Sequence, residues 1–162
     1  MDQLWSPWRF RYVNEGIQTE GCIFCSMAAR EPSHDREMLI LHRARHNFAV
    51  LNLYPYTTGH TLIVPYAHLA RLTDLDGETL SEMMDVAKRV QQAIEVSYHP
   101  DGYNLGMNQG RVAGAGVADH VHLHVLPRWI GDTNFMTVVG ETRLHPEELI
   151  TTYDKITALL GK

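Results

Sequence analysis

Three histidines alternate with aliphatic residues in the stretch Asp119-His-Val-His-Leu-His-Val-Leu126. Alternate side chains of a β-strand lie on the same face, so a strand here places His120, His122 and His124 on one face. The valines and leucine between them fall on the other face of the strand, which we expect to be buried. Same-face neighbours lie about 7 Å apart, close to the span of a phosphate group with its oxygens. We therefore expect three imidazoles on one open, rigid face.

Three imidazoles side by side indicate a functional site, because burying them without a shared ligand would leave many polar atoms unpaired. Two kinds of site fit: a metal centre, or a nucleophile with flanking donors that acts on a phosphate. Imidazole has a pKa near 6.5, so near neutral pH it serves as a neutral nucleophile or a charged donor. The glycine-rich residues 110–116 precede the strand. Glycines let backbone amides approach an anion closely, which favours phosphate chemistry.

The only two cysteines, Cys22 and Cys25, form a Cys-x-x-Cys motif. In a reducing compartment such a pair is more often a metal or redox site than a structural disulfide. Zinc would need two further nitrogen or sulfur ligands, whereas a thioredoxin-like role lacks its βαβ context. Taken alone, the pair is ambiguous between half of a zinc site and a redox pair.

Strand patterns predict an antiparallel sheet. Two apolar runs joined by a Pro/Gly turn indicate a hairpin or meander, and two further strands follow the central part of the chain. The expected strands are 48–53, 61–65, 103–108 and 117–126, the last of which ends before Pro127.

Two helices are expected. Apolar residues at helical spacing between Asp76 and Ser97 predict an amphipathic helix of about five turns, with Met83 and Met84 in the core. A second helix is expected over residues 146–160, with Pro146 in its first turn. A mixed α+β domain with helices mainly on one side of the sheet follows.

Composition excludes several classes of function. The chain has 162 residues, 44% hydrophobic and 20% charged, which is enough for one domain with a core. A net charge of −5 without a basic run argues against a general binder of nucleic acid polymers. No apolar run approaches a membrane span and no signal peptide is evident, so we expect a cytoplasmic protein without membrane attachment. Aromatic residues within residues 1–21, among them Trp5, Trp8 and Tyr12, suggest an arm that packs on the domain or on a second subunit.

The histidine-rich strand resembles the signature of the histidine triad (HIT) family of nucleotide-binding hydrolases and transferases. The resemblance extends through Asn52 and the segments 59–65, 108–110 and 127–128, and covers about residues 21–137. Residues 4–9 and 127–135 look like the dinucleoside polyphosphate branch of the family.

The resemblance implies a HIT-like α+β fold: a five-stranded antiparallel sheet, a long amphipathic helix and a C-terminal helix, with the sheet continued across a homodimer. It implies a single domain with an arm at 1–21, a core at 22–137 and a C-terminal segment at 138–162. The implied activity is cleavage at the α-phosphate of adenine nucleotides or dinucleoside polyphosphates through a nucleotidyl-histidine, by hydrolysis or transfer. The alternatives are a phosphoramidase-type hydrolase of adenylyl conjugates, a regulatory nucleotide-binding protein with little turnover, and a zinc-only structural module.

Carried over residue by residue, the resemblance makes His122 the nucleophile, supported by His124 and His60. The implied substrate-binding residues are Asn52, Asn108, Gln109, Gly114, Ala115, Gly116 and Val117. The implied ligands of a structural Zn²⁺ are Cys22, Cys25, His68 and His120. Members of the family often carry Gln or Ser followed by Ser or Thr where Gly116-Val117 stands here. One side-chain donor to the leaving group is therefore missing, and backbone amides must do more of the binding.

The other histidines and Trp129 are less informative. Trp129 has two interpretations, stacking on a base or a second subunit, and plain packing. The histidines expected to be exposed are His34, His42, His46, His99 and His145.

Overall fold

The computed structural model describes residues 21–133 and 147–161. Most of the expected aromatic arm lies outside the described residues, as do Pro146 and His145.

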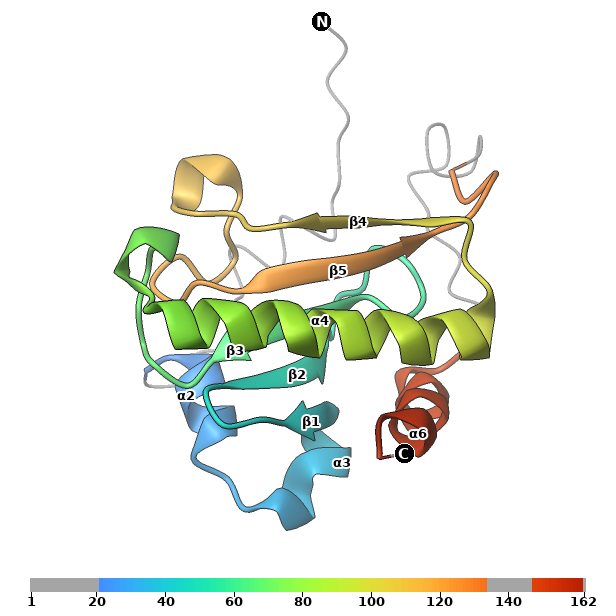
Figure 1. Ribbon diagram of the computed structural model, residues 1–162, viewed down its shortest axis with the longest axis horizontal. Helices are drawn as coiled ribbons and strands as arrows, with labels where there is room; N and C mark the ends of the chain where they lie inside the picture. Colours follow the sequence, from blue (N-terminus) through green and yellow to red (C-terminus); the bar gives the residue numbers. More distant parts are fainter. Residues whose placement is uncertain (1–20, 134–146, 162) are drawn as a thin grey trace, which may run out of the picture.

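The described chain forms an α+β fold around one five-stranded sheet (Figure 1). Its strands are β1 (Ile40–Arg43), β2 (Asn47–Leu51), β3 (Thr61–Pro65), β4 (Gly102–Gly106) and β5 (Leu123–Arg128). Its α-helices are α2 (Ile23–Ala28), α3 (Asp35–Met38), α4 (Gly77–Tyr98) and α6 (Leu149–Leu160), and its 3-10 turns are η1 (Pro32–His34), η2 (Leu72–Asp74) and η3 (Arg111–Ala113). The sheet order is β1-β2-β3-β5-β4, and all neighbours are antiparallel. The expected fold class and five-stranded sheet are confirmed.

The strand that follows the glycine-rich loop begins later than expected. Only Leu123 onward belongs to β5, because the backbone N–H of Val121 donates to the carbonyl of Leu69 and not to a neighbouring strand. The expectation that the strand ends before Pro127 is also wrong. Pairing with β3 stops at Val125, and beyond it Pro127 pairs with β4 alone, so its missing N–H removes no bond to β3.

The long helix α4 begins and ends within one residue of the expected bounds. Asp76 caps its first turn, accepting a hydrogen bond from the backbone N–H of Thr79 at 2.7 Å. His99 ends it in the left-handed conformation, with φ of 47°. Met83 is buried as predicted, but Met84 is 54% exposed, since it lies one position further round the helix. The prediction that both methionines fill the core is therefore wrong for Met84.

Two hydrophobic clusters cover the two faces of the sheet. The larger one joins the sheet to α4 and α6 and includes Val121, Leu123 and Val125. The smaller one lies on the opposite face, under α2, and includes Phe24 and Leu62. The aliphatic residues between the histidines thus occupy the α4 side, as the alternation predicted. Helix α6 packs against α4 and β1 and starts at Leu149, three residues later than expected.

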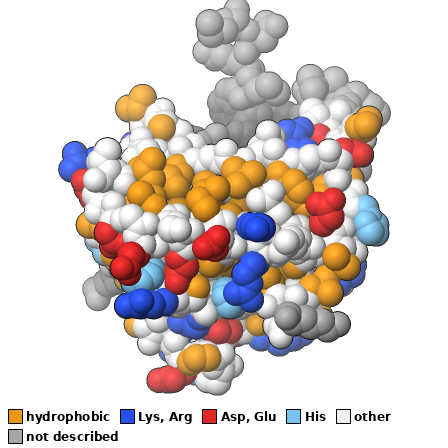
Figure 2. Space-filling view, viewed as in Figure 1, with side chains coloured by type: hydrophobic (Ala, Val, Ile, Leu, Met, Phe, Trp, Pro, Cys, Tyr) orange, Lys and Arg blue, Asp and Glu red, His pale blue; other side chains and the backbone are white. Residues whose placement is uncertain are grey.

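A hydrophobic band is visible on the α4 side of the molecule (Figure 2). The exposed large apolar side chains of the described chain include Met84 and Val96 of α4 and Leu105 of β4, which is the edge strand of the sheet. Among the described helices, none has the length and apolar character needed to cross a membrane.

The remaining histidines only partly match their expected exposure. His34 and His99 are exposed, whereas His42 and His46 are half-buried. His42 lies 3.0 Å from the guanidinium of Arg89, which is a donor, so the ring nitrogen accepts.

Candidate active site and metal site

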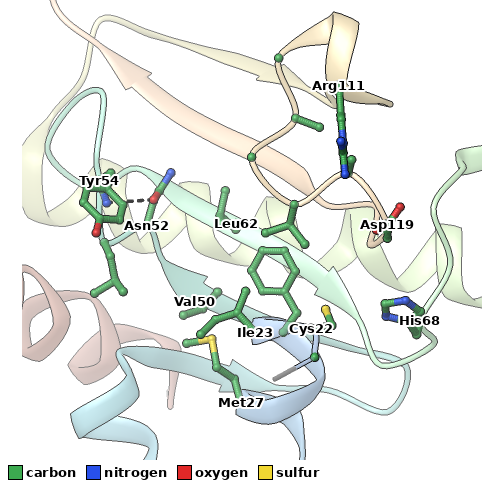
Figure 3. Close-up of a pocket in the computed structure, with 18 of the residues that line it drawn as sticks. Cys22, Ile23, Met27, Val50, Asn52, Tyr54, Leu62, His68, Arg111 and Asp119 are labelled. Carbon is green, nitrogen blue, oxygen red and sulfur yellow. Dashed lines mark hydrogen bonds between the residues drawn. The ribbon is translucent and has the colours of Figure 1, made fainter. Parts of the chain in front are cut away.

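A pocket of about 800 Å³ lies on the face of the sheet opposite α4. This volume is within the range of small-molecule sites. Most of its lining comes from α2 with the two residues before it, β2 with the residues after it, and the loop from η3 to Asp119, and Leu62 of β3 and His68 complete it (Figure 3). Its floor is apolar, with Val50 and Leu62, and its wall on the α2 side carries Ile23, Phe24 and Met27.

Five of the seven predicted substrate-binding residues line this pocket. They are Asn52, Gly114, Ala115, Gly116 and Val117. Asn108 and Gln109 are not among the residues that line it. The Gln109 side chain is directed to η2, where its Oε1 accepts from the backbone N–H of Leu72 at 2.9 Å.

The triad histidines are buried, so the expected open face is wrong. Their exposed fractions are 0% for His120, 4% for His122 and 8% for His124. The cover comes from α2, because the Phe24 ring lies 5.4 Å from the His120 ring and 5.1 Å from the His122 ring between centroids.

A backbone carbonyl fixes the tautomer of His122. Its Nδ1 lies 2.9 Å from the carbonyl oxygen of His120, which can only accept, so Nδ1 carries the proton. The lone pair is therefore on Nε2. Burial lowers the pKa of His122, and the bond to the His120 carbonyl only partly opposes this. At neutral pH the side chain is a neutral imidazole, the form that acts as a nucleophile.

A second chain of hydrogen bonds fixes His60 and His124. The backbone N–H of Tyr56 donates to His60 Nδ1 at 3.1 Å, so the proton of neutral His60 is on Nε2. His60 Nε2 lies 2.9 Å from His124 Nδ1 and donates to it. His124 then carries its own proton on Nε2. Burial, with a smaller effect of His122, lowers the pKa of His124 to about 4, so this residue is also neutral near pH 7.

Asn52 is held at the edge of this hydrogen-bond chain. Its Oδ1 accepts from the backbone N–H of Tyr54 at 3.0 Å, the bond drawn in Figure 3, and its Nδ2 lies 3.3 Å from His60 Nδ1. The amide therefore faces both the pocket and the histidine relay.

The four predicted metal ligands converge beside the pocket. One ligand atom from each of Cys22, Cys25, His68 and His120 lies within 4.8 Å of the others. Nδ1 of His120 is 3.3 Å from the Sγ of Cys22, and Nδ1 of His68 is 3.2 Å from the Sγ of Cys25. Tetrahedral zinc with bonds of about 2.3 Å to sulfur and about 2.1 Å to nitrogen requires sulfur–nitrogen separations of about 3.6 Å. The donor set and its spacing therefore fit a zinc ion.

The surroundings of His120 also suit a metal ligand. Its Nε2 donates to the carbonyl oxygen of Pro65 at 2.8 Å, which leaves the lone pair of Nδ1 directed at the cysteines. Burial, followed by the adjacent Cys22 thiol, raises the pKa of Cys25. A bound cation would reverse this effect and favour the thiolate form.

Three contributors to the site did not follow from the sequence motifs: Phe24, Tyr56 and Arg111. Phe24 covers His122, Tyr56 orients His60 through its backbone, and Arg111 lines the pocket. The position of Phe24 inside the Cys-x-x-Cys motif is the one signal that could have identified it. The structure favours plain packing for Trp129, whose Nε1 donates to the carbonyl of Tyr98.

Comparisons with known proteins agree with this geometry. The HIT domain model matches residues 35–129. An AP-4-A phosphorylase from Mycobacterium tuberculosis is 35% identical over 154 residues, covering 92% of this chain and 79% of that protein. An adenosine 5'-monophosphoramidase from Saccharomyces cerevisiae is 37% identical over 108 residues, covering 66% of this chain and 62% of that protein.

A solved structure of similar fold carries zinc. The crystal structure of a Zn-bound histidine triad family protein from Mycobacterium smegmatis superposes with a TM-score of 0.69 at 32% identity, covering 87% of this chain and 94% of that one. The domain match, the relatives and the arrangement of the three histidines lead to one conclusion. The chain belongs to the histidine triad family.

Proposed function

We propose that the protein is a nucleotidyl transferase that cleaves dinucleoside polyphosphates such as diadenosine tetraphosphate, with inorganic phosphate as the acceptor. The observation that carries the proposal is the buried, neutral His122 with its lone pair on Nε2 beside a His124 that holds its proton on Nε2. One is the proposed nucleophile and the other the proposed donor, and their ring centroids lie 4.9 Å apart. The M. tuberculosis AP-4-A phosphorylase, similar over most of both chains, supports this choice of substrate and acceptor.

In the first step, His122 Nε2 attacks the α-phosphorus of one adenylyl group. A phosphorus–nitrogen bond forms and the bond from phosphorus to the bridging oxygen breaks, so ATP leaves from diadenosine tetraphosphate. The Nε2–H of His124 stabilises negative charge on the phosphoryl oxygens. His122 keeps its Nδ1 proton throughout, and the bond to the His120 carbonyl stabilises the positive ring that results.

In the second step, inorganic phosphate attacks the same phosphorus from the vacated side. The phosphorus–nitrogen bond breaks, ADP forms, and His122 regains its lone pair. Water in place of phosphate would yield AMP, so the acceptor decides between phosphorolysis and hydrolysis.

We further propose that Cys22, Cys25, His68 and His120 hold a structural Zn²⁺. A zinc ion here links α2 to the start of the histidine segment and carries no part of the transfer. The donor set, its spacing and the zinc-bound relative support this assignment.

A homodimer is also proposed, in which β4 continues the sheet into a second copy. β4 is an edge strand with exposed residues, and it borders the hydrophobic band of Figure 2. Light scattering coupled to size exclusion should give twice the mass of 18.4 kDa. A monomer at micromolar concentration would contradict the dimer.

The deciding experiment is incubation with diadenosine tetraphosphate, with and without phosphate, followed by product analysis. ADP and ATP formed only with phosphate would support a phosphorylase. AMP and ATP formed without phosphate would indicate an asymmetric hydrolase. Intact mass after a short incubation should show one added adenylyl group on the wild type and none on His122→Asn.

A phosphoramidase is the second candidate, because the S. cerevisiae relative of that name matches the core of this chain. Adenosine 5'-phosphoramidate should be the better substrate if this candidate is right. Nucleotide binding without any adenylyl intermediate would instead indicate a regulatory binding protein.

A further inference from the structure

The pocket has one strong cationic side chain among its described lining residues, Arg111. It belongs to η3 and is exposed. Within the described chain, no hydrogen bond or ion pair uses its guanidinium, not even with Asp119 on the same wall. Figure 3 shows the side chain extending from η3 towards the loop that carries Asp119.

The glycine-rich loop offers fewer amide donors to an anion than its composition suggests. The N–H groups of Gly114 and Ala115 donate to the carbonyls of Arg111 and Gly110, at 3.0 and 3.3 Å. In the described chain, the amides of Gly116 and Val117 have no such partner. These two amides, of Gly116 and Val117, are enough to bind about one phosphate group at the pocket.

A polyphosphate carries more negative charge than these two amides can bind. Each additional phosphate of a leaving group adds about one negative charge, while the whole chain already has a net charge of −5. The pocket floor is apolar and offers no charged group to these phosphates. An unpaired guanidinium on the pocket wall supplies the missing positive charge and can bind phosphate oxygens in a bidentate way.

We infer that Arg111 binds the phosphates beyond the scissile bond, and so makes the site select polyphosphate leaving groups over short uncharged ones. The inference rests on the proposed nucleotidyl transfer and specifies its substrate class. Members of the family often carry a side-chain donor to the leaving group where Gly116-Val117 stands here. Arg111 supplies a side-chain donor in its place. Arg111 belongs to η3, which Gly110 and Gly114 flank with φ of 80° and 85°, a backbone conformation that glycine adopts without steric cost.

The test compares two substrates that share the adenylyl group and differ in leaving group. Diadenosine tetraphosphate releases a triphosphate chain, and adenosine 5'-phosphoramidate releases ammonia. Arg111→Gln should lower kcat/KM for the first by about tenfold to a hundredfold, the range for losing a charged hydrogen bond, and leave the second unchanged. The matched control is Arg30→Gln, which removes the same charge from an exposed arginine that does not line the pocket.

Equal losses on both substrates, or no loss on diadenosine tetraphosphate, would overturn the inference. Titration calorimetry with ATP and AMP tests it without turnover: Arg111→Gln should weaken ATP binding by about tenfold and leave AMP binding unchanged. If the wild type transfers no adenylyl group, the proposed function fails. The ATP and AMP affinities still decide whether Arg111 binds the distal phosphates.

Discussion

Removal of the proposed zinc ion should destabilise the protein and also damage the pocket beside its ligands. Helix α2 has six residues, so its own hydrogen bonds cannot keep it folded in isolation. It is held by the packing of Phe24 and by the two cysteines that flank that residue. Cys25→Ser should therefore release one end of α2 from the cluster that contains His68 and His120.

The size of the effect follows from how well the four ligands are placed. Their sulfur–nitrogen separations of 3.2 to 3.7 Å lie close to the value of about 3.6 Å for tetrahedral zinc, so little rearrangement opposes binding. Free zinc at a thousandfold excess over its Kd stabilises the folded state by about 4 kcal/mol. At about 2 to 4 °C per kcal/mol for a chain of this size, losing the metal should lower Tm by about 8 to 16 °C.

The assay combines metal analysis by mass spectrometry with scanning calorimetry. The wild type should contain one zinc per chain, Cys25→Ser much less, and Ser26→Ala, an exposed neighbour in the same helix, as much as the wild type. A chelator should lower the Tm of the wild type and leave that of Cys25→Ser unchanged. Because Phe24 lies 5.1 Å from His122 between ring centroids, KM for nucleotide should rise as well. Equal zinc content in Cys25→Ser and the wild type would refute the reasoning.

Three further predictions concern the histidines and the turn before them. His122→Asn should abolish the adenylyl intermediate and, because the residue is 4% exposed, lower the free energy of unfolding in urea by roughly 1 to 3 kcal/mol; retained turnover would exclude His122 as nucleophile. The pKa of His124 is about 4 in the fold and about 6.5 when unfolded, so the unfolded state binds more protons between these values. Stability should fall by up to roughly 3 kcal/mol as pH drops through that window, and His124→Gln should flatten this part of the denaturation profile; an equally steep profile would contradict the assignment. Gly59→Ala should cost about 1 to 2 kcal/mol, because Gly59 has φ of +78° and a Cβ there meets Pro127 Cγ at 3.4 Å; an unchanged Tm would show that the turn relaxes freely.

Long periodic patterns predicted the fold well. The helical spacing between Asp76 and Ser97 gave α4 within one residue, because an apolar stripe of that length has only one stable arrangement on a sheet. The strand 61–65 was also predicted with its exact bounds. The alternation around His122 placed the aliphatic residues on the correct face, although the strand itself starts at Leu123.

Short elements and tertiary contacts could not be predicted in the same way. β1 has four residues and a register shift between Ile40 and His42. Such a strand is too short for an alternation of apolar and polar residues to identify it. Helix α2, with six residues, is also short, so the burial of the histidines beneath Phe24 had no local signal. The N–H of Gly114 donates to the carbonyl of Arg111 within its own loop. This bond depends on the conformation of η3, which the amino-acid composition of the loop does not specify.

The functional difference that we propose between the three histidines arises from the backbone groups around them and not from their alternation along the chain. A carbonyl two residues earlier accepts a hydrogen bond from Nδ1 of His122 and leaves the lone pair on Nε2, the atom that we propose as the nucleophile. The carbonyl of Pro65 binds the opposite nitrogen of His120 and turns its Nδ1 towards the cysteines. The amide of Tyr56 acts through His60 to leave the proton of His124 on Nε2, as its proposed role of donor requires. Each of these backbone groups is available whatever the side chain at its position, so one row of identical residues can supply a metal ligand, a nucleophile and a donor.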